Sequence, residues 1–410
     1  MKADSELLPQ LFRKEFSKMV AVISKIYGLQ HIEIAEDIVS ETFLTATESW
    51  VKKGIPPNAT AWLYAVAKQK TLYHFRRKKI FDQKIIPQVK FSTDTIAETK
   101  VMDFSNENIK DSQLEMMFAI CDPTIASEAQ IALALRVLCG FGIEEIAEAF
   151  FSNKETINKR LFRAKEKLRA EKLELEMPPE KEIDSRLDNV LHIIYLLFNE
   201  GYYSASQNQI LRKEFCMEAL RLGLILTDYS KTNLPKTDAL VALMSFHASR
   251  LDARQSADDN IILYEEQDEN QWDKELIEQG THFLSLSAEG DTLTSYHLEA
   301  GIAYWNCQKE DTQEKREAIL HHYNLLMEIN YSPGVALNRL YALYKARGKH
   351  IALSEAKKLT VPKNHFYYML LGELYSEIDN EKAKENFEKA VVIAKTESEK
   401  QLIKQKIKNL

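Results

Sequence analysis

The sequence predicts an all-α protein with several domains. Glycine and proline are scarce, at 12 and 10 of 410 residues, whereas strand-rich and Rossmann-like folds need many more turns. Apolar residues recur at helical spacing in most long segments. The chain is 45% hydrophobic and 28% charged, which is typical of a globular protein, and its length exceeds what a single core usually supports.

Composition also excludes several classes of protein. No apolar run approaches the ~20 residues that cross a membrane, and the N-terminus is too charged for a signal peptide. Because no HExxH, GxSxG, Walker or GxGxxG motif is present, we expect no enzyme, no cofactor and no metal. We expect a cytoplasmic protein with reduced thiols, since its four cysteines are far apart and lack CxxC spacing: Cys121, Cys139, Cys216 and Cys307.

The first eighty residues predict a small helical module. A loop is expected where Gly54, Pro56 and Pro57 break helices, and Asn58 or Thr60 is expected to cap the helix that follows. The predicted helices cover residues 11–27, 32–50 and 61–79.

The rest of the chain alternates between helical patterning and two breaks. Residues 81–112 lose periodicity and predict a linker that includes a short helix. Helical patterning returns over 122–170, and EMPPEKE at 176–182 is the second break. Beyond that break the pattern is helical to the last residue.

Charge is spread unevenly along the chain. The net charge of the whole chain is −7. Residues 1–179 are close to neutral, and the rest of the chain has a net charge of about −8, so the acidity lies in the C-terminal half. The N-terminal half gathers its basic residues into two clusters, Lys68–Lys79 and Lys154–Lys172. Clustered positive charge in an otherwise acidic chain is typical of a nucleic-acid surface.

The stretch GIEEIAEAFFSNKETINKRLFRAKEKLR predicts a helix–turn–helix. A short helix over 143–149 is followed by a turn, and Ser152 is expected to cap the next helix in a reciprocal box with Glu155. The second helix should bury one face, formed by Ile157, Leu161, Ala164 and Leu168.

The opposite face of that second helix is polar and basic, with Lys154, Asn158, Lys159, Arg163 and Lys167, and with Arg160 and Lys165 at its flanks. A capped helix with such a face suits the major groove, because its first turns meet base edges and its later cations meet phosphates. The alternative is an ordinary solvated helix face.

This segment resembles the region 4 helix–turn–helix of bacterial sigma factors of the extracytoplasmic-function group, a module that reads the promoter −35 element. The shared pattern comprises Glu145, Ile146, Ala147, Thr156, Ile157, Arg160, Leu161, Arg163, Ala164, Lys165 and Leu168. The resemblance implies −35 contacts by Lys154, Glu155, Thr156, Asn158, Lys159, Arg160, Arg163 and Lys167.

The phrase AEDIVSETFLTATESW resembles sigma region 2.2, the helix that docks on the coiled coil of the RNA polymerase β′ subunit. The resemblance implies that Asp37, Ile38, Glu41 and Phe43 bind the core polymerase. An acidic and apolar helix face suits a basic, rigid helical partner. Internal packing of Ile38, Phe43 and Leu44 is an alternative, and the two roles are compatible.

The phrase AWLYAVAKQKTLYHFRRKK resembles sigma regions 2.3 and 2.4, which handle the −10 element. It keeps Trp62, Leu63, Ala67, Arg76 and Arg77, and it departs at Gln69 and Tyr73, where the family usually has Asn and Asp. In such sigma factors the preceding loop captures a flipped base, and Asn58 is our preferred polar contact. The implied −10 residues are Lys53, Asn58, Thr60, Lys68, Lys70, Tyr73, Arg76 and Arg77.

The C-terminal half extends well beyond the usual end of such sigma factors. IYLLFNEGYYSAS at 194–206 resembles a subgroup with a tetratricopeptide-like helical extension, and later segments predict about three antiparallel helix pairs. Polar residues beside large aromatic residues either form a functional site or stabilise contacts between helices. Both interpretations stay open for one group of residues: Asn199, Glu200, Gln267, Asp268 and Trp272.

The sequence therefore predicts a sigma factor with four parts. They are region 2 (1–85), a linker (86–115), region 4 (116–177) and a helical regulatory extension (178–410), tetratricopeptide-like toward its end. The expected partners are RNA polymerase core, promoter DNA and a protein effector of the extension, with no membrane. The alternative is a helix–turn–helix regulator with a tetratricopeptide-type sensor that acts without core polymerase.

Overall fold

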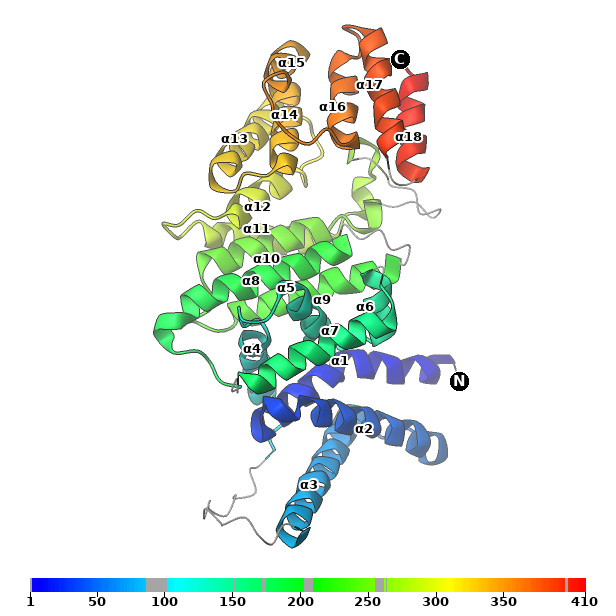
Figure 1. Ribbon diagram of the computed structural model, residues 1–410, viewed down its shortest axis with the longest axis vertical. Helices are drawn as coiled ribbons and strands as arrows, with labels where there is room; N and C mark the ends of the chain where they lie inside the picture. Colours follow the sequence, from blue (N-terminus) through cyan, green and yellow to red (C-terminus); the bar gives the residue numbers. More distant parts are fainter. Residues whose placement is uncertain are drawn as a thin grey trace. The chain divides into compact units, whose positions relative to one another are not determined.

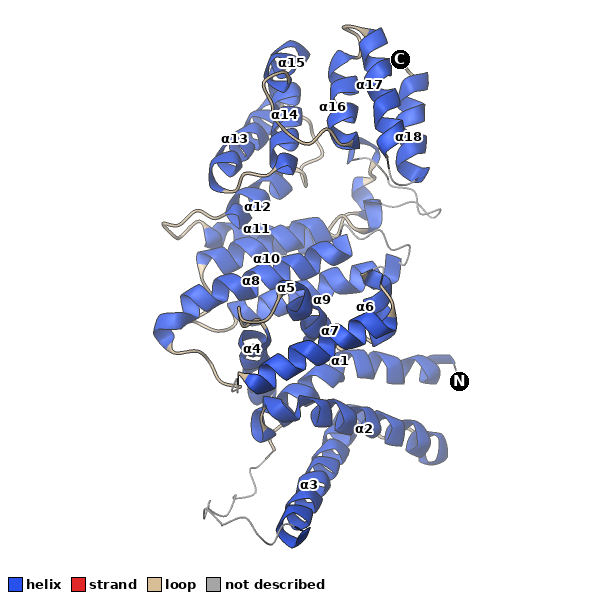
Figure 2. Cartoon of the chain, viewed as in Figure 1, coloured by secondary structure: helices blue, strands red, loops and turns tan. Residues whose placement is uncertain are grey.

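The computed structural model describes residues 2–85, 102–150, 152–171, 175–202, 209–254, 262, 264–394 and 397–410. These residues form helices and connecting turns without a strand, which confirms the predicted all-α class (Figure 2). The chain divides into two compact units, Met1–Thr232 and Asn233–Leu410, which we call unit 1 and unit 2.

Unit 1 begins with the three predicted helices: α1 (Lys2–Tyr27), α2 (Ile32–Lys53) and α3 (Ala59–Ile85), with a short 3-10 turn, η1 (Leu29–His31), after α1 (Figure 1). Gly28 ends α1 with φ +91°, a conformation that glycine adopts without strain. Asn58 caps α3 by accepting from the Ala61 amide at 2.9 Å.

Aromatic contacts hold these three helices together. Phe12 of α1 meets Phe43 of α2 edge-on at 5.0 Å between ring centroids. Tyr27 stacks on Phe75 of α3 at 3.7 Å. Packing of this kind contributes beyond the buried area itself, so the module has a defined geometry.

The second part of unit 1 contains α4 (Asn106–Ile120), α5 (Ser127–Leu133), the π-helical turn η2 (Ala134–Leu138), α6 (Ile143–Ala149) and α7 (Lys154–Ala170). Helix α4 occupies the end of the expected linker, and residues 86–101 lie outside the described residues. Helix α1 packs on α4 and η2, so the N-terminal module and the helix–turn–helix share one unit.

Two further helices complete unit 1, α8 (Glu180–Tyr202) and α9 (Gln209–Thr227). They pack on one another, and they also contact α4, α5 and α6. The side chains of Leu187, Leu191 and Leu197 are fully buried. Unit 1 therefore ends about 55 residues after residue 177, where the sequence predicts the end of region 4. That predicted boundary between region 4 and the extension stays a prediction.

Unit 2 is a chain of helices in which each packs on the next. It comprises α10 (Pro235–Ala248), three short turns (η3 Asp252–Arg254, η4 Tyr264–Glu266, η5 Glu269–Gln271), α11 (Lys274–Ser287), α12 (Ser295–Trp305), α13 (Gln313–Ile329), α14 (Pro333–Arg347), α15 (Lys349–Ala356), α16 (His365–Tyr375), α17 (Asn380–Ile393) and α18 (Glu397–Lys408). Packing of successive helices is the arrangement of helical repeats, and α13/α14 and α16/α17 are antiparallel pairs at the positions where the sequence predicts them.

Asp238 in α10 predicts a pH-dependent stability. Burial raises the pKa of this carboxyl to about 6, against His282, which lowers it, and its Oδ1 atom has no hydrogen-bond partner. A raised pKa means that the folded state prefers the protonated acid. The contribution of Asp238 to the free energy of unfolding is therefore greatest below the ordinary pKa of 3.8 and is lost as pH rises through 6.

We expect Asp238→Asn to raise the free energy of unfolding at pH 7.5 by up to about 3 kcal/mol and to flatten its change between pH 5 and 7.5. Denaturant unfolding at both pH values measures this. Exposed Asp291→Asn is the matched control, and an equal pH response of wild type and Asp238→Asn would contradict the expectation.

Candidate nucleic-acid and polymerase interface

The segment that the sequence predicts as a helix–turn–helix contains α6 and α7, and the predicted cap of α7 needs a correction. The cap of α7 is Asn153, whose side chain accepts from the Thr156 amide at 2.8 Å, and the expected cap at Ser152 is wrong. Ser152 instead donates its backbone N–H to Ala147 at the end of α6. Both residues are good caps, and the extended backbone at Asn153 decides which one acts.

The two faces of α7 are as the sequence predicts, except at Lys165, which is buried. The inner face is buried at Ile157, Leu161, Ala164 and Leu168. Among the predicted −35 residues, Thr156, Arg160 and Lys167 are half-buried, and the others are exposed: Lys154, Glu155, Asn158, Lys159 and Arg163. Lys154 pairs with Glu144, Arg160 with Glu128 and Lys167 with Glu171, all at the surface, so DNA phosphates can replace these carboxylates at small cost.

Phe162, an exposed aromatic residue on α7, was not among the residues predicted from the sequence. Phe162 is 58% exposed between the basic residues of the outer face. An apolar side chain at this place can contact a thymine methyl in the major groove. The position follows from helical spacing alone, because Phe162 falls opposite the buried stripe.

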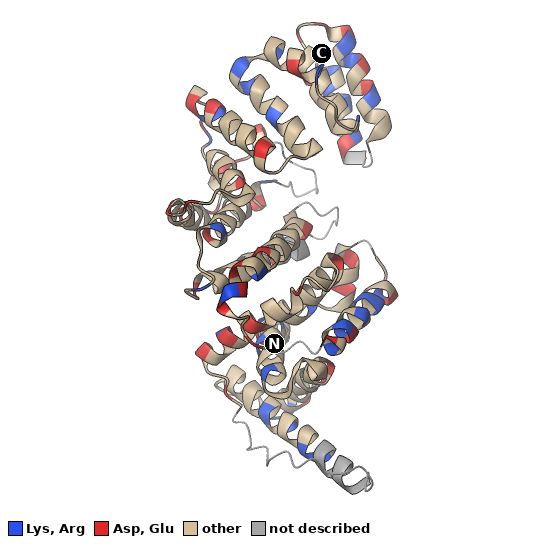
Figure 3. Cartoon of the chain, turned by 60° about the vertical axis from the view of Figure 1, so that its left-hand side comes forward, with Lys and Arg blue, Asp and Glu red and all other residues tan. Residues whose placement is uncertain are grey.

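The predicted −10 residues lie on α3 and the loop before it. Tyr73, Arg76 and Arg77 are exposed near one another on α3, and Figure 3 shows Lys and Arg along this helix. Of the others, Lys53 and Asn58 are exposed, and Thr60, Lys68 and Lys70 are half-buried. The side-chain oxygen of Asn58 caps α3, so its side-chain NH2 group is the part that could donate to a base.

The predicted polymerase-binding residues divide into two kinds. Asp37 and Glu41 are exposed one helical turn apart on α2. Ile38 and Phe43 are buried, so the structure gives them the packing role that the sequence left open. Leu44 was expected to pack internally as well, and this is wrong because it is 64% exposed.

Together these side chains define one face of α2, which we call the α2 face: Asp37, Glu41, Leu44, Glu48 and Val51. The spacing of four, three, four and three residues keeps them in line along the helix. Val51 is 84% exposed. Burial raises the pKa of Asp37, and its acidic neighbours Glu36 and Glu41 raise it further, while Lys165 opposes them. A face that is acidic and apolar at once suits a cationic helical partner.

A buried ion-pair group joins α2 to η2 and α7, and no sequence pattern predicted it. Glu36 of α2 accepts from Arg136 of η2 at 2.8 Å and from Lys165 of α7. Glu36 and Lys165 are buried, although Lys165 was expected at the flank of the DNA-binding face. Near the edge of this contact Arg169 pairs with Glu33.

We expect Glu36→Gln to lower the free energy of unfolding by about 3–5 kcal/mol, because it leaves two cations near an uncharged partner in a buried place. Chemical denaturation measures the change. The matched control Glu48→Gln removes a charge from the same helix at an exposed position and should alter stability by less than about 0.5 kcal/mol. A Glu36→Gln protein as stable as wild type would show that the group contributes nothing.

A second connection runs from α1 to both the helix–turn–helix and α9. Arg13 pairs with Glu145 of α6 and with Glu214 of α9, at 3.3 Å for the latter, and its guanidinium lies 3.9 Å from the centre of the Phe141 ring. Arg221 of α9 donates to the Leu138 carbonyl at 2.8 Å. Helix α9 therefore contacts the parts of unit 1 that carry the predicted DNA-binding residues.

The polar residues singled out in the C-terminal half fall into both units. Asn199 and Glu200 lie on α8, where burial raises the pKa of Glu200. Gln267 and Trp272 are buried beside η4 and η5 of unit 2, and Asp268 caps η5 through the Asn270 amide. The structure thus describes them as two separate groups.

The described part of the chain contains no group of three or more His, Cys, Asp or Glu residues placed to hold a metal ion. None of its helices is long and apolar enough to span a bilayer.

Comparison with known proteins gives three results. Residues 11–80 match the family described as Sigma-70 region 2, and residues 186–288 match a family of unknown function, DUF6596. R00370, an uncharacterized protein of Rhizobium meliloti (strain 1021), is 28% identical over 386 residues, which cover 93% of this chain and 91% of that protein. No solved structure matches. The region 2 match covers most of α1, all of α2 and most of α3, and it supports a sigma factor role in transcription initiation.

Proposed function

We propose that this protein is an alternative sigma factor of the extracytoplasmic-function group that directs RNA polymerase to specific promoters. The observation that carries the proposal is the Sigma-70 region 2 match over the same helices that present the α2 face and the exposed cations of α3. The chemistry is recognition and not bond making, since sigma factors confer promoter choice on a polymerase that is itself the enzyme.

In this proposal the α2 face binds the β′ coiled coil of the core polymerase. Asp37 and Glu41 attract a basic partner and set its orientation. Leu44 and Val51 supply exposed apolar area that the partner would cover. Large exposed apolar side chains that line up with acidic ones are expected of a binding surface.

DNA reading is divided between two helices. The amino-terminal turns of α7 enter the major groove of the −35 element, where Asn158 reaches base edges and Lys159 and Arg163 reach phosphates. Tyr73 of α3 offers a stacking surface for the unwound −10 strand, and Arg76 and Arg77 follow its backbone.

The alternative, a regulator that acts without core polymerase, is less well supported. Such a protein needs a DNA-binding helix–turn–helix, but it has no use for a region 2 module with an exposed acidic and apolar helix face. The region 2 match therefore favours the sigma factor.

Reconstitution tests the proposal directly. The full-length protein is mixed with sigma-free core polymerase and genomic fragments, and transcript start sites are mapped. We expect co-purification with core and a defined set of start sites that share −35 and −10 sequences. DNA binding without core binding would instead support the alternative function.

Replacement of Lys159 and Arg163 by alanine should weaken promoter binding and flatten its dependence on salt. Each lost phosphate contact reduces the slope of log affinity against log salt by roughly 0.9, so the pair should reduce it by up to about 1.8. Filter binding of the polymerase complex between 50 and 200 mM salt measures the slope.

The matched control is Lys363→Ala with Lys384→Ala, which removes the same charge from exposed positions of unit 2. An unchanged slope in the α7 variant would exclude Lys159 and Arg163 from the DNA interface.

A further inference from the structure

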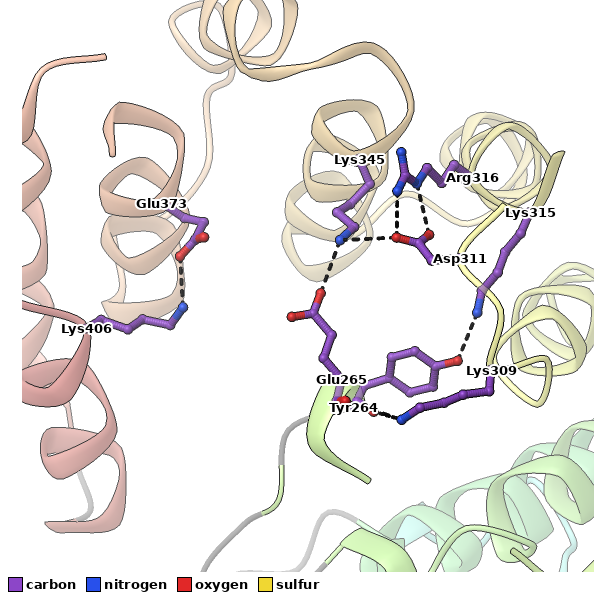
Figure 4. A network of polar contacts seen from close by, with 9 residues as sticks. All are labelled: Tyr264, Glu265, Lys309, Asp311, Lys315, Arg316, Lys345, Glu373 and Lys406. Atoms are coloured by element: carbon purple, nitrogen blue, oxygen red, sulfur yellow. Dashed lines mark hydrogen bonds and ion pairs between the residues drawn. The ribbon is translucent and has the colours of Figure 1, made fainter. Parts of the chain in front are cut away.

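Three cations surround one aromatic side chain in unit 2. The centre of the Tyr264 ring lies 5.5 Å from Arg250 Cζ, 5.6 Å from Lys309 Nζ and 5.0 Å from Lys315 Nζ. Trp272 lies beside the same ring, with 6.3 Å between ring centroids. We call these five residues the Tyr264 cluster. They come from the turn after α10, from η4, from the residue after η5, and from the start of α13 and the loop before it. Figure 4 shows three of them, Tyr264, Lys309 and Lys315.

The carboxylates near the Tyr264 cluster are already engaged by other cations. Asp311 accepts from both ends of the Arg316 guanidinium and lies 3.7 Å from Lys345, while Glu265 pairs with Lys345 at 3.1 Å (Figure 4). Among the described residues no ion pair is formed by Arg250, Lys309 or Lys315. The cluster therefore holds about three positive charges that nearby described carboxylates do not balance.

Neutral oxygens hold the two lysines in place without neutralising them. Lys309 Nζ donates to the carbonyl oxygens of Tyr264, Glu265 and Gln267, the last at 2.7 Å. Lys315 Nζ donates to the Tyr264 hydroxyl at 2.8 Å and to the Gln308 carbonyl.

Burial makes this concentration of charge unfavourable. Lys315 is 4% exposed and Arg250 is 6% exposed. Burial lowers the pKa of Lys315, Asp311 acts in the opposite direction, and the neighbouring Arg250 lowers it further. Buried cations are ordinarily paired with an anion, so three cations around one ring require an explanation beyond cation–π attraction.

The same place contains buried polar atoms without partners. Arg250 Nε and Trp272 Nε1 are donors that find no acceptor, and both residues are 6% exposed. Gln267 Oε1 is a buried acceptor that likewise has no partner. Cation–π contacts explain why lysines lie near the rings, but they leave these N–H groups unsatisfied.

We propose that the Tyr264 cluster binds a small oxyanion, a phosphate or carboxylate group, which accepts hydrogen bonds from Arg250 Nε and Trp272 Nε1 and balances Lys309 and Lys315. The site would join α10, η4 and α13, so an occupied site would stiffen unit 2. This inference goes beyond the proposed role in transcription initiation and does not depend on it.

The test uses the full-length protein without polymerase or DNA. Isothermal titration calorimetry and thermal unfolding are recorded with inorganic phosphate, with acetate, and with sodium chloride at matched ionic strength. We expect saturable binding of phosphate or acetate with a rise in melting temperature, and no saturable effect of chloride. Which of the two anions binds distinguishes a phosphate source from a carboxylate source.

Variants assign the binding to the Tyr264 cluster. Lys309→Gln removes one half-buried charge and should weaken anion binding at least tenfold, whereas the control Lys363→Gln removes an exposed charge from the same unit and should leave it unchanged. Arg250→Lys keeps the charge and removes the Nε–H donor, so it should also weaken binding. Calorimetry at low temperature keeps destabilised variants folded during the measurement.

The absence of saturable binding of both anions to wild type would overturn the proposal. Equal affinity of wild type and Lys309→Gln would overturn it too, because the anion would then lie elsewhere, such as on the cations of α7.

Discussion

Replacement of both Asp37 and Glu41 by arginine should weaken binding of core polymerase by at least a hundredfold and leave the protein folded. Both side chains are exposed on the α2 face, and Glu41 makes only a surface contact with Lys70 at 3.4 Å. Losing such a pair costs about 0–1 kcal/mol of stability, whereas like charges opposed across an interface cost several kcal/mol of binding. Pull-down of core and fluorescence anisotropy measure the affinity.

The matched control is Glu107→Arg with Asp111→Arg, which reverses the same two charges at the same spacing on α4. This variant should bind core normally. Circular dichroism and a melting curve check that both double variants are folded. Wild-type affinity in a folded Asp37/Glu41 variant would refute the assignment of the α2 face.

A gentler substitution separates the acidic from the apolar part of that face. Leu44 is exposed, so Leu44→Ser removes apolar contact area without opening a cavity in the core. Its effect on core binding would show whether the exposed leucine serves the interface, a role that the family resemblance alone did not assign.

Features that depend on neighbours in sequence were predictable. Gly28 and Gly54 end helices because the chain there adopts positive φ, and the buried stripe of α7 follows from spacing of three and four residues. The error at Ser152 is of the same local kind, since two adjacent residues can both cap a helix and only the backbone at Asn153 chooses between them.

Features that depend on distant parts of the chain were not predictable. By helical spacing Lys165 falls on the edge of a basic helix face. Nothing nearby in sequence reveals that Glu36, 129 residues away, accepts a hydrogen bond from its buried ammonium group. The Tyr264 cluster is similar, because Arg250 and Lys315 are brought together only when the helices of unit 2 pack. Sequence patterning marked Gln267 and Trp272 as unusual, but it could not supply their cationic neighbours.

Tertiary packing also sets the C-terminal boundary of the folded unit that contains the sigma-like segments. By resemblance the DNA modules are complete near residue 177, and the helical extension follows a short EMPPEKE junction. In the structure α8 and α9 lie against α4, α5 and α6, and Arg221 of α9 donates to the carbonyl of Leu138 in η2. The first two helices of the extension therefore support the helix–turn–helix.

Truncation after Met177 should consequently abolish transcription, and truncation after Thr232 should preserve the fold of unit 1. The shorter fragment loses α8 and α9 and exposes the core that they cover, including the contacts of Leu187, Leu191 and Leu197. Each such side chain contributes about 1.5–3 kcal/mol when buried, and a domain has only about 5–15 kcal/mol of net stability. Melting curves and run-off transcription with core polymerase compare fragments 1–177 and 1–232 with the full chain.

The two fragments separate structural support from regulation by unit 2. If fragment 1–232 melts cooperatively and transcribes as well as the full chain, then the extension acts through α8 and α9, and unit 2 is a separate binding module. If fragment 1–232 folds but differs in activity from the full chain, then unit 2 controls the activity of the protein. A stable and fully active fragment 1–177 would contradict the supporting role of α8 and α9, because the buried contacts they make with α4, α5 and α6 would then be dispensable.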